Sequence, residues 1–187
     1  MSGSEYTFFL LTFWYRPAYS MRQLLDSRQG HAAALVIAAL FGIIQLSRLF
    51  SVKSEKIAWY LVICGFCGIA ALYLFGWLIH NFGRWFGVDA QQREVRIAFG
   101  LGILPWTIIF AVIFVMLSLG LEPELIAAKY FPIVLGAYIY GFCILLLSLT
   151  AALRLSVIKT FLCLTVTILF SLFPLTLLAQ FLAGYLS

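Results

Sequence analysis

Five apolar stretches, separated by short loops that carry most of the basic residues, make up the greater part of this 187-residue chain. They cover residues 31–49, 57–80, 97–119, 130–149 and 157–185. A helix of about 20 residues crosses the hydrocarbon core of a bilayer, so each stretch is long enough for one crossing. The sequence therefore predicts an all-α, polytopic membrane protein built as a bundle of five transmembrane helices.

The composition agrees with this class. Hydrophobic residues make up 64% of the chain and charged residues 10%, whereas a soluble domain is about half apolar and about a quarter charged. The net charge of +5 does not indicate a nucleic-acid partner, because the basic residues lie singly or in threes and form no dense run. Loop cations of this kind set topology and contact headgroups, so we expect anionic membrane lipids as partners.

Residues 1–30 are predicted to form a cytoplasmic or interfacial segment ahead of the transmembrane domain of residues 31–187. The aromatic-rich run at 6–15 is too short to cross a bilayer, and aromatic rings favour the headgroup boundary. Pro17 suits the first turn of a helix. Three apolar residues then fall on one face of that helix: Met21, Leu24 and Leu25. We therefore predict an amphipathic helix in the interface.

The orientation follows from the Lys and Arg residues of the short loops. Eight of them fall on one side of the predicted bundle: Arg16, Arg22, Arg28, Arg84, Arg93, Arg96, Arg154 and Lys159. Four fall on the other side: Arg48, Lys53, Lys56 and Lys129. Because the more basic side stays in the cytoplasm, we predict a cytoplasmic N-terminus and an external C-terminus, in a bacterial cytoplasmic (inner) membrane.

The predicted spans contain little that indicates catalysis. None has an Asp or Glu in its central portion, which counts against a proton-coupled transporter or a two-aspartate intramembrane protease. Cys64 and Cys67 are spaced as half of a metal or redox site, but no second pair matches them, and His80 lies at a span end. We expect no catalytic residue, metal or cofactor. An intramembrane enzyme using the cysteine pair or His80 is the weakest alternative.

Glycines recur where helices must approach closely. Lipid tails are as apolar as Leu, so transmembrane helices associate through close packing that small residues permit. Gly83 and Gly87 also allow a tight exit from the second span. The candidate helix-packing residues are Gly65, Gly68, Gly76, Gly83, Gly87 and Pro105.

The richest polar segment is the predicted cytoplasmic loop at residues 80–96. Its cations and exposed aromatic rings can contact anionic lipid or the acidic surface of a partner. Together with the N-terminal segment it forms a predicted contact set for lipid or protein: Arg16, Pro17, Arg22, Arg84, Trp85, Arg93 and Glu94. The partner is an unidentified protein or a second copy of the chain.

The order of these features resembles the bacterial branch of the Yip family, membrane proteins named for interaction with Ypt/Rab GTPases. The resemblance rests on Arg16-Pro17, Met21-Arg22, Gly76-Trp77, the segment 83–87, Arg93-Glu94 and Pro105. It implies a five-helix domain with a cytoplasmic N-terminus, and eukaryotic relatives act as membrane adaptors in vesicle trafficking. This chain lacks their long N-terminal region and Asp-Leu-Tyr-Gly-Pro type motif, so GTPase binding is not implied. Val88 stands where bacterial relatives often have glycine.

Two functions remain open from the sequence. The first is a non-enzymatic membrane adaptor that organises lipids or partner proteins through its cytoplasmic face. The second is a transporter or channel for a small or lipid-like substrate through the bundle. A polar path between the helices would favour the second function, and a closed bundle would favour the first.

Overall fold

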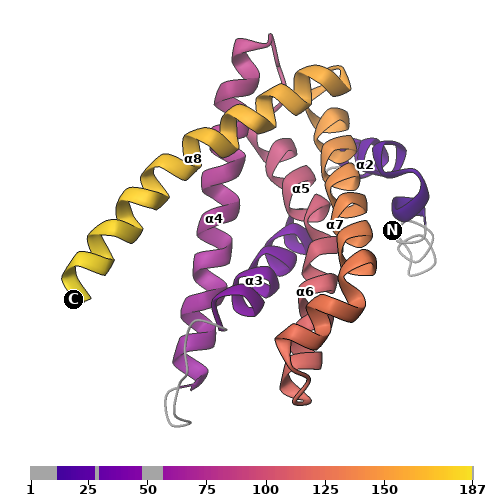
Figure 1. Ribbon diagram of the computed structural model, residues 1–187. Coiled ribbons are helices and arrows are strands. Elements are labelled where there is room, and N and C mark those ends of the chain that lie inside the picture. Colours follow the sequence, from indigo (N-terminus) through magenta and orange to yellow (C-terminus); the bar gives the residue numbers. More distant parts are fainter. Residues whose placement is uncertain (1–11, 28–29, 48–56, 187) are drawn as a thin grey trace.

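The computed structural model describes residues 12–27, 30–47 and 57–186, and this part of the chain is all-α, as predicted (Figure 1). After a short helical turn at residues 12–15 the helices are α2 (Pro17–Asp26), α3 (His31–Ser47), α4 (Ile57–Trp85), α5 (Gln92–Gly102), α6 (Leu104–Ser118), α7 (Pro123–Leu153) and α8 (Val157–Leu186). Most of the predicted interfacial aromatic run lies outside the described residues. So do four of the cations used to predict orientation: Arg28, Arg48, Lys53 and Lys56.

Three helical segments of the described residues are long and apolar enough to cross a membrane: Ala58–Trp85, Gln92–Ser118 and Ala128–Leu153. They correspond to the second, third and fourth predicted spans. The other two predicted spans coincide with shorter apolar helical stretches, His31–Leu46 and Val157–Ser171. Large apolar side chains are exposed on the outside of the bundle, such as Phe66, Ile133 and Leu169. So much exposed apolar surface is expected of a protein whose solvent is lipid.

The end of α4 is fixed by a glycine in the left-handed conformation. Gly87 has φ +82°, and its N–H donates to the Arg84 carbonyl at 3.1 Å while the Val88 N–H donates to the Gly83 carbonyl at 3.3 Å. This pair of bonds is the Schellman motif that closes a helix. No other group would contact a Cβ at Gly87, so this residue serves the turn and not helix packing.

The third predicted span is two helices, because Pro105 lies in the first turn of α6. Proline has no N–H, so the carbonyl four residues earlier loses its helical partner and α5 ends at Gly102. The span also begins five residues earlier than predicted. A Glu94 carboxylate oxygen accepts the Gln91 N–H at 3.1 Å and so caps the start of α5 at Gln92.

α3 and α4 approach each other at glycine. A Cβ placed on Gly68 would overlap the Ala38 carbonyl oxygen and would lie 2.9 Å from the Cα of Gly42. The two backbones are therefore in direct contact, as in small-residue packing of membrane helices. In Figure 1, α3 crosses obliquely between α4 and α6, and α8 crosses α4 and ends far from the other helices.

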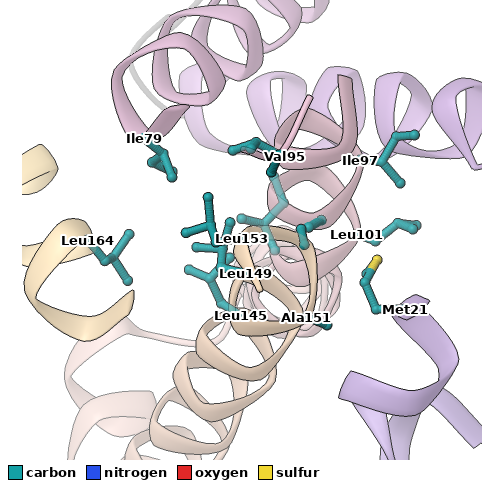
Figure 2. Close-up of a cluster of buried hydrophobic side chains, with 14 of the residues drawn as sticks. Met21, Ile79, Val95, Ile97, Leu101, Leu145, Leu149, Ala151, Leu153 and Leu164 are labelled. Atoms are coloured by element: carbon teal, nitrogen blue, oxygen red, sulfur yellow. The ribbon is translucent and has the colours of Figure 1, made fainter. Parts of the chain in front are cut away.

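The main core surrounds α5. Figure 2 shows its side chains converging from α2, α4, α5, α7 and α8. Val95 and Leu149 are fully buried in this core, and Met21 and Leu24 attach α2 to it with 0% and 4% of their surface exposed. Leu25 is half-buried. The N-terminal helix α2 thus has the predicted apolar face, and this face packs against the core of the bundle.

Candidate functional site

The predicted contact set divides into two groups in the structure. Arg84 and Trp85 are exposed at the end of α4. Arg16, just before α2, and Arg22, on α2, are exposed, and α2 lies beside the upper part of α7 (Figure 1). Trp14, just before α2, stacks on Tyr140, and its carbonyl accepts the Tyr140 hydroxyl at 2.5 Å. Since Tyr140 is 13 residues before the end of α7, Trp14 is about 20 Å along the helix axis from that end.

A polar groove joins the end of α2 to the start of α5, and we call it the α2–α5 groove. Its volume is about 300 Å³, and its lining residues are Leu25, Asp26, Gln91, Arg93, Glu94 and Ile97. Arg93 and Asp26 are exposed, whereas Glu94 is half-buried by its bond to the Gln91 N–H. The groove brings together two residues of the predicted contact set, Arg93 and Glu94, with an aspartate that the prediction omitted.

Arg96 lies deeper than these residues and was counted among the cations of the cytoplasmic side. A Cβ on Gly76 of α4 would overlap the Arg96 Cγ, so the aliphatic part of Arg96 lies directly on this glycine. The guanidinium carbon lies 4.4 Å from the centre of the Tyr73 ring, in the geometry of a cation–π interaction. The Arg96 Nε is buried and has no hydrogen-bond partner. Gly76 therefore accommodates the Arg96 side chain where α4 and α5 meet.

The other predicted packing residues have separate places. Gly65 and Gly68 face α3, and Gly83 lies against Val88 and Leu153 in ordinary van der Waals contact. Pro105 is buried at the start of α6. Gly42, which the prediction did not name, and Gly100 and Gly102 at the start of the third span also have neighbours closer than an ordinary Cβ contact.

An apolar cavity of about 470 Å³ lies inside the bundle between α3, α4, α5, α6, α7 and α8. Its walls are aliphatic and aromatic, and Phe75 and Phe99 stack across one side of it with ring centres 5.6 Å apart. Trp106 also lines it, and its Nε1 donates to the Tyr138 carbonyl at 3.0 Å. The cavity is within the usual size of small-molecule sites, but its walls suit a hydrocarbon and not an ion or a sugar.

The polar side chains of α8 give no polar path in its described part. Thr165, Thr167 and Ser171 each donate to the carbonyl four residues earlier, at 2.9, 2.8 and 2.7 Å. These hydroxyls are satisfied within their own helix. The side chains of residues 172–186 lie outside the described set.

The cysteine pair does not form one site. Cys64 is buried at the α3–α4 contact, whereas Cys67 is exposed on the outside of α4, and both thiols are free. Among the described residues no group of three or more His, Cys, Asp and Glu side chains could hold a metal ion.

Comparison with known proteins gives no match: no family model fits the chain, and no curated protein or solved structure is significantly similar to it. The resemblance to the Yip family therefore stays a prediction.

Proposed function

We propose that this chain is a non-enzymatic, five-span membrane protein that organises anionic lipids, or partners bound to them, through its cytoplasmic face. The α2–α5 groove carries this proposal. It is a polar hollow of about 300 Å³ that combines an exposed arginine with two carboxylates beside the predicted interfacial helix. Groups of both signs at the surface of a bundle suit recognition of a headgroup or a polar protein segment.

Fixed attachment of α2 supports a recognition surface. Met21 and Leu24 hold this helix against the core, and Trp14 is stacked on Tyr140 of α7 at 6.1 Å. A surface held by such contacts keeps its geometry when a ligand binds, which lowers the entropic cost of binding.

Lipid binding by charge reversal tests the proposal. The protein is purified in a mild detergent, and the co-purified phosphatidylglycerol is measured for the wild type and for Arg84→Glu combined with Arg93→Glu. We expect the double variant to retain several-fold less of this lipid, since each basic residue near an anionic surface contributes on the order of 1 kcal/mol. Lys129→Glu at the opposite end is the matched control. Equal lipid content in all three proteins would remove the proposal.

The apolar cavity supports a second candidate, passage of a lipid-like substrate through the bundle. Ala71 of α4 and Ala38 of α3 line this cavity, so Ala71→Trp would fill it. Vesicles containing the wild type should then move a fluorescent lipid analogue between leaflets faster than vesicles containing Ala71→Trp. Equal rates in the two preparations, at the level of protein-free vesicles, would exclude this candidate.

A further inference from the structure

The apolar cavity lies at the middle of all three long spans. Ala71 and Leu72, which line it, are the two central residues of Ala58–Trp85. Trp106 lines it directly after the centre of Gln92–Ser118, and in α7 the lining residues lie on both sides of the centre of the apolar segment. A helix that crosses a bilayer has its centre near the middle of the hydrocarbon core. The cavity is therefore at the depth where the acyl chains of lipids end.

This cavity has buried walls and an exposed rim. Leu72, Ile103 and Leu145 form the buried walls. Tyr138 of α7 and Ile168 of α8 also line the cavity, yet they have 46% and 44% of their surface exposed. The cavity therefore reaches the outer surface of the helices at these two residues. At that depth the medium around the protein is hydrocarbon.

The polar atoms of the aromatic wall are already paired. The Trp106 Nε1 donates to the Tyr138 carbonyl at 3.0 Å, and the two rings are stacked with centres 5.1 Å apart. The other described residues of the wall are Ala, Gly, Leu, Ile and Phe. A cavity lined in this way gives water no hydrogen-bond partner and stays dry. Its occupant must be apolar.

The volume of the cavity suits the end part of an acyl chain. At about 470 Å³ it is about three times as large as an engineered protein cavity of about 150 Å³ that binds benzene, so it holds on the order of 10–20 carbons. An empty cavity forfeits dispersion contacts with the atoms that line it. A chain that enters from the bilayer regains these contacts, and it only exchanges one apolar medium for another.

We infer that the cavity holds the end of one acyl chain of a membrane phospholipid, which enters at Tyr138 and Ile168 while its headgroup stays at the bilayer surface. Such a site holds a lipid beside the bundle by its chain, whereas the proposed function concerns headgroups. It also differs from passage through the bundle, because the glycerol and the headgroup do not enter. Occupancy depends on the three long spans crossing a bilayer and not on the surface cations.

Photo-crosslinking in vesicles tests the inference. The full chain is reconstituted in phosphatidylcholine with one of two diazirine-bearing phosphatidylcholines, labelled either at the end of an acyl chain or next to the glycerol ester. Mass spectrometry then locates the adducts. We expect the chain-end probe to label the buried walls at Leu72, Ile103 and Leu145, which lipid outside the bundle does not reach. The probe labelled near the glycerol should leave these three residues unmodified.

Two tryptophan variants on neighbouring residues form a matched pair. Ala71→Trp fills the cavity, so the chain-end probe should no longer label the buried walls. Ala70→Trp places the same side chain on the exposed side of α4 and should keep the labelling of the wild type. Phe66, which is exposed on α4, should be labelled equally in both variants. Wild-type labelling of the walls in a folded Ala71→Trp protein would overturn the site.

The two probes on the wild type decide the matter even if Ala71→Trp does not fold. Buried walls without any adduct from the chain-end probe would overturn the site. Equal labelling of the walls by both probes would mean that the whole lipid enters, which would overturn a site for the chain alone. Arg84→Glu with Arg93→Glu should leave the labelling unchanged, so failure of the surface proposal would not remove this site.

Discussion

Adding one methyl group to Gly68 should destabilise the bundle, whereas the same change at Gly136 should stabilise it. The new Cβ at Gly68 would overlap the Ala38 carbonyl oxygen and would lie 2.9 and 3.0 Å from the Cα and N of Gly42. All three atoms belong to the backbone of α3, so no side chain can rotate away. At Gly136 of α7 nothing lies within 4 Å of the new Cβ.

The magnitude follows from two opposing terms. Replacing Gly by Ala inside a helix stabilises the helix by about 1 kcal/mol at either position, because Ala has the higher helix propensity. Overpacking costs about 1–3 kcal/mol, and the upper value applies at Gly68 because α3 as a whole must move. We expect Gly68→Ala to lower the free energy of unfolding by about 2 kcal/mol and Gly136→Ala to raise it by about 1 kcal/mol. In a chain of this size these changes correspond to a Tm about 4–8 °C lower and about 2–4 °C higher.

Thermal unfolding in detergent measures both changes in Tm, and the cysteine thiols of the chain report the unfolding. Cys64 and Cys163 are buried, whereas Cys67 and Cys143 are exposed. Replacing the two exposed cysteines by Ser leaves only buried thiols, which react with a fluorogenic maleimide when the bundle opens. A Gly68→Ala protein that melts with or above the Gly136→Ala protein would refute the backbone contact between α3 and α4.

Three further predictions use the same assay. Glu94→Ala removes the carboxylate that accepts the Gln91 N–H and should cost about 0.5–1 kcal/mol. Asp89→Ala, in the exposed loop before α5, should cost nothing measurable. Trp106→Phe removes a hydrogen bond to a backbone carbonyl and should lower the free energy of unfolding by about 1 kcal/mol. A Tm equal to that of the wild type would contradict this bond. Ala71→Leu places apolar volume in the cavity and should raise stability by about 0.5–2 kcal/mol; a lower Tm would mean that the cavity is already filled by packing.

Local features of the fold were predictable from the sequence because they depend on neighbouring residues. The length of the apolar stretches predicts the second and fourth spans, which are helices α4 and α7 in the structure. Pro17 in the first turn of α2 and Gly87 after α4 act through φ alone. Such local rules need no knowledge of the partner helix.

Contacts between helices were less predictable. Gly42 and Gly68 meet because α3 crosses α4 at that point, and a single sequence does not contain the crossing point. Gly76 was predicted as a packing residue from its type, and it is the Arg96 side chain of α5 that lies against it. Small residues make room, but they do not specify whether a backbone or a long side chain occupies it.

At Arg96 the helix-capping signal predicts the start of α5 better than hydropathy does. The apolar stretch begins at Ile97, so Arg96 was counted with the loop. A glutamate three residues after Gln91, with both groups bonded at the start of α5, places the helix start at Gln92 and Arg96 in its second turn. An arginine there points along α5 toward α4 and cannot be treated as loop charge. Because a partly buried arginine is costly in a membrane protein, the capping signal identifies Arg96 as a residue packed against Gly76 and Tyr73 of α4.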